Sequence, residues 1–162
     1  MNLSKNEAFY FIEMLESSLI NYRVINPWAD QIILKIKEPP VWIFDLSLKK
    51  YQGDLLKALR EFAYSEPFEK EPDDIDKFHV ACLWLRYERR ELSWATLLNK
   101  IGYYLDAHNG NWDCETPYHY LNIYEVSNFT ETSEEETKKE YLSEQNVIPY
   151  LKKAKDKLRE LS

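Results

Sequence analysis

The sequence predicts an all-α protein, an irregular bundle of about seven helices. Along most of the 162 residues, apolar side chains recur at steps of three and four, which places them on one face of a helix. Residues that favour helix N-termini stand directly before several of these runs, and prolines separate the runs. The alternative is an α+β fold with a small sheet formed by residues 41–48 and 118–126, whose Tyr, Ile and Val content also suits strands.

The first helix begins at Ser4, three positions before Glu7, and the two side chains predict a capping box. Its apolar stripe consists of Ala8, Ile12, Leu15, Leu19 and Tyr22. Asn26 and Pro27 predict the start of the second helix, because the missing N–H of proline goes unused in a first turn.

Two prolines end that segment, since proline lacks a backbone donor and restricts the residue before it. Residues 41–50 then fit a short helix or a strand, and we favour the helix. Gly53 and Asp54 precede the next helix, whose stripe is Leu55, Leu56, Leu59, Phe62 and Ala63. Residues 75–91 are apolar nearly all round, which is typical of a helix in the middle of a bundle.

Ser93 caps the following helix, and Asn109 with Gly110 predicts a left-handed stop after it. Its stripe is Trp94, Leu97, Leu98, Ile101, Tyr104 and Leu105. A Thr-Pro pair then opens residues 116–126, which we assign as helix although a strand fits the composition equally well.

The distribution of charge predicts two regions. Residues 1–130 form a helical globular domain and carry −6 of the total charge of −7. The rest, residues 131–162, is an acidic linker followed by an amphipathic C-terminal helix. Residues 131–144 carry −4, and residues 147–162 carry +3. We expect this last helix to pack on the same domain or on a partner, because its apolar stripe is narrow.

Composition argues against several ligands and locations. An acidic body repels a phosphate backbone, so nucleic acid is not expected to bind. The longest run without Asp, Glu, Lys or Arg is nine residues, whereas a membrane-spanning helix needs about twenty apolar ones. Glu7 and Glu13 interrupt the apolar core that a secretory signal would need. We therefore expect a cytoplasmic protein in which Cys82 and Cys114 are free thiols.

Familiar catalytic and cofactor-binding motifs are missing. With three glycines, the sequence contains neither a P-loop nor a dinucleotide-binding loop. The nucleophile elbow, the zincin motif and the calcium-binding loop are absent as well. The sequence therefore predicts no enzyme activity, no cofactor and no metal.

The stretch 106–119, together with the central helix, gathers potential metal ligands and nucleophiles. The five side chains concerned are His79, Cys82, His108, Cys114 and His119. Their spacing matches no zinc-binding motif, and Asp113 and Glu115 are expected to raise the pKa of the Cys114 thiol. We interpret the stretch as a connection between helices and keep a metal- or thiol-dependent enzyme as the alternative.

Acidic and aromatic residues predict a partner-binding surface. Carboxylates crowd the loop before the central helix, at Glu66, Glu69, Glu71, Asp73 and Asp74. Such a charge run is expected to be solvated and to steer a basic partner. Aromatic residues beyond position 102 exceed what one core face needs, so some should be exposed anchors for that partner. The candidates are Tyr103, Trp112, Tyr118, Tyr120 and Tyr124.

These patterns predict a small acidic protein-binding module that covers part of a basic partner protein. In size and charge the chain is similar to the immunity proteins with which bacteria neutralise a cognate toxin, and no motif accompanies this similarity. A further alternative is a structural subunit whose tail helix, near residues 147–161, docks on a second copy of the chain.

Overall fold

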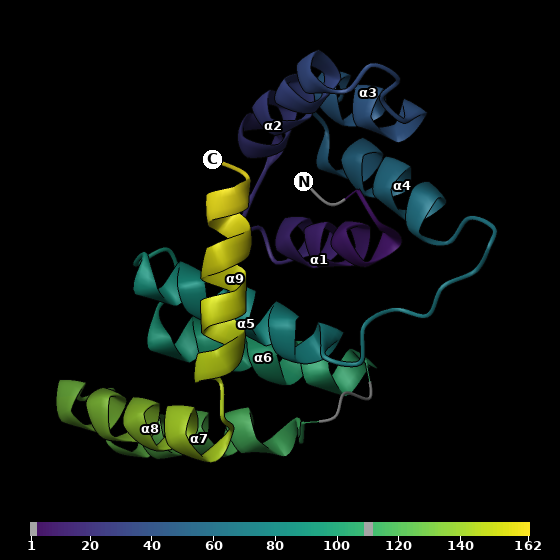
Figure 1. The fold of residues 1–162 in the computed structure, drawn as a ribbon. Coiled ribbons are helices and arrows are strands. Elements are labelled where there is room, and N and C mark those ends of the chain that lie inside the picture. Colours follow the sequence, from purple (N-terminus) through teal and green to yellow (C-terminus); the bar gives the residue numbers. More distant parts are fainter. Residues whose placement is uncertain (1–2, 109–111) are drawn as a thin grey trace. The chain divides into compact units, whose positions relative to one another are not determined.

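A computed structural model describes residues 3–108 and 112–162, and these residues form nine α-helices and no strand (Figure 1). The predicted all-α class is confirmed, and the stretches that also fitted strands are helices. The count exceeds seven because segments with weak apolar stripes are helical too. The helices are α1 (Lys5–Glu16), α2 (Tyr22–Lys35), α3 (Val41–Leu48), α4 (Gln52–Ala63), α5 (Ile75–Glu88), α6 (Trp94–His108), α7 (Glu115–Val126), α8 (Glu131–Glu144) and α9 (Ile148–Glu160).

The chain forms two compact units. Unit 1 comprises Met1–Ile75 together with Asp156–Ser162, and unit 2 comprises Asp76–Lys155. The predicted division of the chain at residue 130 stays a prediction. No helix in the described ranges is both long enough and apolar enough to cross a membrane.

In unit 1, α1 packs against α4, and α2 packs against α3 (Figure 1). The Ser4 half of the predicted capping box is present, since the Ser4 hydroxyl accepts a hydrogen bond from the Glu7 amide at 3.4 Å, while the Glu7 carboxylate pairs with Lys157. The core contains the Phe11 and Trp28 rings, which meet edge to face with their centroids 4.9 Å apart. Each buried ring removes a large apolar area from water, so these contacts hold α1 against α2.

The predicted start of the second helix at Asn26 is wrong. The helix begins at Tyr22, because the Asn21 side chain caps it by accepting from the Arg23 amide at 2.9 Å. Pro27 lies inside the helix, where it removes one backbone hydrogen bond. Asn26 has a different function, since its side-chain amide donates to the Lys49 carbonyl at 2.9 Å and so ties α2 to the end of α3.

Three of the described helices end in a Schellman motif whose left-handed residue is not glycine, and Asn146, with a φ of 49°, is a further left-handed residue after α8. Ser18, Arg90 and Asn128 have φ angles of 60°, 61° and 61°, after α1, α5 and α7 respectively. Each is followed by the paired backbone hydrogen bonds of a Schellman motif. This motif usually contains glycine, which adopts the left-handed conformation without strain. In these three turns a residue with a side chain takes the place of glycine and is strained. The stop predicted at Asn109 and Gly110 lies outside the described residues.

In unit 2, α5 is buried on nearly every side, as its all-round apolar pattern predicts. Helix α8, which we expected as part of an acidic linker, has a narrow buried face made of Ser133, Thr137 and Tyr141. The Trp94 indole N–H donates to the Thr137 hydroxyl at 3.1 Å, which joins α6 to α8. Acidic residues thus cover the outside of a helix whose inner face is packed.

Candidate functional site

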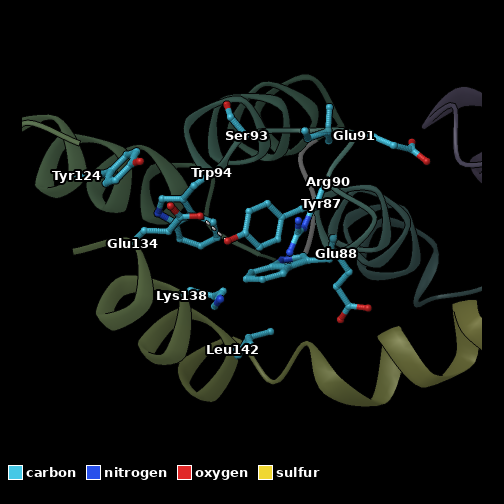
Figure 2. Close-up of a pocket in the computed structure, with 12 residues that line it drawn as sticks. Tyr87, Glu88, Arg90, Glu91, Ser93, Trp94, Tyr124, Glu134, Lys138 and Leu142 are labelled. Atoms are coloured by element: carbon cyan, nitrogen blue, oxygen red, sulfur yellow. Dashed lines mark hydrogen bonds between the residues drawn. The ribbon is translucent and has the colours of Figure 1, made fainter. Parts of the chain in front are cut away.

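Unit 2 contains a pocket of about 750 Å³ that most of its helices help to form (Figure 2). Its wall runs from Trp84 to Trp94, across the end of α5, the turn and the start of α6. Tyr124 of α7 closes one side, and Glu134, Lys138 and Leu142 of α8 close another. The volume lies in the range typical of small-molecule sites, about 300–1,000 Å³.

Three aromatic rings form the rigid part of this wall. The Trp84 and Trp94 rings have their centroids 5.4 Å apart, and Tyr87 lies 5.8 Å from Trp84 and 5.5 Å from Trp94. Trp84 and Trp94 are each only 1% exposed, so packing fixes their orientation. These two buried rings therefore hold the half-buried Tyr87 ring in place at the pocket.

Glu134 joins two tyrosines at one edge of the pocket. The Tyr87 hydroxyl donates to the Glu134 carboxylate at 2.6 Å, as the dashed line in Figure 2 marks. Burial raises the pKa of the Tyr87 hydroxyl, and this hydrogen bond raises it further. Burial also raises the pKa of Tyr124, with the nearby Glu134 charge as the second cause. Both hydroxyls stay protonated and keep the Glu134 carboxylate occupied.

The other acids of the pocket wall have partners within the protein. The Glu88 carboxylate pairs with the Lys155 ammonium at 2.9 Å. Glu91 pairs with the Arg86 guanidinium at 3.0 Å. Among the charged groups of the pocket that the structure describes, Arg90 has no ion-pair partner.

Lys138 is also paired. Its ammonium lies 2.7 Å from the Glu135 carboxylate and 5.7 Å from the centre of the Tyr87 ring. The protein thus supplies its own cation to the face of this ring, an interaction worth about 0.5–1 kcal/mol at an exposed site.

The predicted acidic residues lie on a loop whose two ends are both anchored to α1. We call residues 65–74 the acidic loop. At its start, the Lys5 ammonium donates to the backbone carbonyls of Ser65 and Pro67. At its end, the Tyr10 hydroxyl donates to the Asp74 carboxylate at 2.8 Å. Between these anchors, the side chains of Glu66, Glu69, Glu71 and Asp73 are exposed.

Two aromatic residues that we did not predict accompany these acids. Phe68 is 66% exposed in the middle of the acidic loop, and Tyr64 is 54% exposed directly before it. Burial and then the Glu71 charge raise the pKa of Tyr64, which places this carboxylate near the phenol. A signal was present in the sequence, because Phe68 stands among acids and prolines with no helical periodicity to bury it.

The five predicted aromatic anchors have different environments, and all lie in unit 2, whereas the acidic loop belongs to unit 1. Tyr103 and Tyr118 are exposed. Trp112 is half-buried and contacts Tyr150 edge to face at 5.9 Å. Tyr120 is 2% exposed and donates its hydroxyl to Glu144 at 2.7 Å, so it offers no free surface. Tyr124 lines the pocket.

The five His and Cys side chains do not gather into a centre within unit 2. His79 and Cys82 are buried, and His79 stacks on Tyr104 at 3.7 Å between centroids. His108 stacks on the same tyrosine, and its Nδ1 lies 2.8 Å from the Tyr104 carbonyl oxygen. Of the residues described there, no three His, Cys, Asp or Glu side chains of unit 2 bring their ligand atoms together.

Cys114 has the electrostatic environment that the sequence predicts. Burial raises the pKa of its thiol first, and the charges of Asp106 and Asp113 raise it further. The Cys114 sulfur lies 3.9 Å from the Asp106 carboxylate. A raised pKa disfavours the thiolate, which is the nucleophilic form of cysteine.

Comparisons with protein-family models, with curated proteins and with solved structures found no match.

Proposed function

We propose that this chain is a protein-binding module that recognises a basic partner through the acidic loop. One observation carries the proposal. The loop is fixed to α1 at both ends, and between these anchors its carboxylates and Phe68 are exposed to solvent. Attachment at both ends limits the conformational freedom that a partner would have to restrict, which favours binding.

Charge and apolar area have separate roles in this proposal. The exposed carboxylates attract a basic surface over several ångströms and raise the rate of association. Phe68 and Tyr64 then supply large, amphipathic contact areas of the kind that dominate binding energies. Tyr103 and Tyr118 of unit 2 are further candidate contacts, since both are exposed.

We propose that the module neutralises its partner by occlusion, which means that it covers a functional surface of that partner. The similarity in size and charge to bacterial immunity proteins supports this form. We place the function in the cytoplasm, because neither Cys82 nor Cys114 forms a disulfide and a reducing compartment keeps thiols reduced.

The test compares two triple variants that remove equal charge. Glu66→Gln, Glu69→Gln and Glu71→Gln neutralise the acidic loop. Glu125→Gln, Glu136→Gln and Glu140→Gln serve as the matched control on exposed positions of unit 2. The tagged wild-type chain captures its partner from an extract of the producing cells, and stopped-flow measurements give association rates at several salt concentrations.

We expect the loop variant to associate about ten-fold more slowly at low salt and to lose most of the salt dependence. The control should keep both. Equal rates and equal salt slopes in all three proteins would overturn the proposal. Phe68→Ala, tested in the same assay, should raise the dissociation rate and leave the association rate nearly unchanged.

A further inference from the structure

We propose that the pocket of unit 2 binds a small organic anion, a carboxylate or phosphate monoester carried on an aromatic ring, through the Arg90 guanidinium. The residues that line this pocket belong to unit 2, whereas the acidic loop belongs to unit 1, and the proposal does not rest on the function proposed for the loop. The proposal rests on which polar groups of the pocket have partners and which do not.

The polar groups without partners are both hydrogen-bond donors. Arg90 has no ion pair in the described structure, whereas Glu88, Glu91, Glu134 and Lys138 are each engaged. The Trp84 indole N–H is buried on the pocket wall and has no hydrogen-bond partner. Buried polar groups are nearly always satisfied in folded proteins. This rule applies to the Trp84 N–H, whereas Arg90 is exposed and its guanidinium is accessible. A ligand that bonds to these two donors must bring acceptor oxygens.

The backbone holds Arg90 at the pocket. Its amide donates to the Tyr87 carbonyl at 2.8 Å, and the Glu91 amide donates to the Arg86 carbonyl at 2.9 Å, which closes the turn after α5. Figure 2 shows Arg90 among the residues that line the pocket, and the Glu88 and Glu91 carboxylates point away from the rings. A guanidinium presents parallel N–H donors that match a carboxylate or phosphate.

The aromatic wall of the pocket indicates the chemistry of the rest of the ligand, to which the anionic group is attached. Tyr87 and Tyr124 are the half-buried rings of this wall, and the buried Trp84 and Trp94 hold Tyr87 in place. A partly exposed ring binds an aromatic ligand by stacking or edge contacts. A cationic ligand is disfavoured, because the Lys138 ammonium already lies over Tyr87 and two tyrosines occupy Glu134. The expected ligand therefore has an aromatic ring and one anionic group.

The probes for the test are phenylacetate and phenyl phosphate, with 2-phenylethanol as the neutral control and 2-phenylethylamine as the cationic control. Each is titrated into the full ¹⁵N-labelled chain while the indole N–H signals are recorded by NMR. The chain has five tryptophans, so the Trp84 signal is assigned by triple-resonance experiments. The binding variants are Arg90→Gln and Arg90→Lys, and Arg89→Gln is the matched control at the neighbouring position.

We expect phenylacetate or phenyl phosphate to shift the Trp84 signal saturably, and the tighter of the two identifies the preferred anion. Arg90→Gln should weaken that binding about ten-fold or more, Arg90→Lys should weaken it less, and Arg89→Gln should leave it unchanged. The proposal is overturned by any of three results: no saturable shift with either anion, tighter binding of 2-phenylethylamine, or equal losses from Arg89→Gln and Arg90→Gln. Inorganic phosphate that binds as tightly as phenyl phosphate would overturn the assignment of the aromatic wall.

Discussion

The acidic loop of unit 1 and the pocket of unit 2 use charged residues in opposite ways. In the loop, carboxylates such as Glu66 and Glu69 face solvent. In the pocket, the acids are engaged by neighbouring side chains, and aromatic rings pack in the wall. Exposed charge acts over distance and is screened by salt, whereas paired charge and packed rings act at contact.

Because of this difference, we expect substitutions in the loop to change association rates and substitutions in the pocket to change the free energy of unfolding. Changes in the acidic loop should alter how fast a partner arrives and should hardly affect folding, because solvated side chains lose little when they are replaced. Changes in the pocket should alter the fold itself, since Trp84 and Trp94 belong to the core of unit 2.

The largest effect is expected from Trp84→Ala. The Trp84 ring contacts Trp94, Tyr87 and Tyr141, so its removal leaves a cavity and should lower the free energy of unfolding by about 3–5 kcal/mol. Phe68→Ala in the acidic loop should change it by no more than about 0.5 kcal/mol. Urea unfolding followed by circular dichroism measures both. Similar losses in the two variants would show that the loop is part of the core.

Within unit 1, a buried ion pair and an exposed one provide the same contrast. Lys157 of α9 pairs with Glu7 of α1, and both side chains are only 12% exposed. Lys157→Met leaves the Glu7 carboxylate without this partner in a buried place and should cost about 3 kcal/mol. The Lys70 and Asp73 side chains of the acidic loop also pair but are 77% and 87% exposed, so Lys70→Met should cost less than about 0.5 kcal/mol. Thermal unfolding of the two variants tests the difference, and equal losses would contradict it.

Alkaline pH should weaken unit 2 through its tyrosines. Burial raises the pKa values of Tyr87, Tyr120 and Tyr141 above the ordinary value of 10.0. The folded protein therefore holds protons that the unfolded chain releases, and the free energy of unfolding should fall as pH rises above 10. Tyrosinate absorbance at 295 nm and circular dichroism, recorded together, should show these residues ionising only as the protein unfolds. Ionisation of all twelve tyrosines in a folded protein would contradict this.

Local sequence signals predicted features that depend on a few neighbouring residues. The Ser4 cap and the exposed acids of residues 65–74 are of this kind, because caps and solvated charge runs arise from adjacent positions. Asn26 and Pro27 misled the prediction for the same reason. The pair has the local pattern of a helix start, but Asn21 caps the helix five residues earlier and the Asn26 amide bonds to the end of α3.

The pocket could not be predicted, because three separate stretches of sequence form it. Residues 84–94 meet Tyr124 and residues of α8 only after the helices pack. The same holds for Tyr118 and Tyr120, which are alike in sequence. Tyr118 is exposed and lies beside Gly102 of α6, whereas Tyr120 is buried and bonds to Glu144 of α8, so the packing of α7 on both α6 and α8 distinguishes them. Periodicity indicates that a helix has a buried face, but not which neighbour covers it.

The smallest effect, and the one that joins stability to binding, is expected from Arg90→Gly. Arg90 adopts a left-handed conformation with φ of 61°, which glycine adopts without strain. Arg90→Gly should therefore raise the free energy of unfolding by about 0.5–1 kcal/mol. Ser18→Gly, at a left-handed turn with φ of 60° in unit 1, is the matched control and should stabilise by a similar amount.

Only Arg90→Gly should abolish the shift of the Trp84 signal by phenylacetate or phenyl phosphate, because Ser18 lies outside the pocket. A strained residue whose replacement improves folding but removes ligand binding is the pattern expected where a backbone conformation is kept for function. If Arg90→Gly destabilises the protein while Ser18→Gly stabilises it, the Arg90 side chain contributes to the packing of unit 2. In that case its position at the pocket is explained by folding alone.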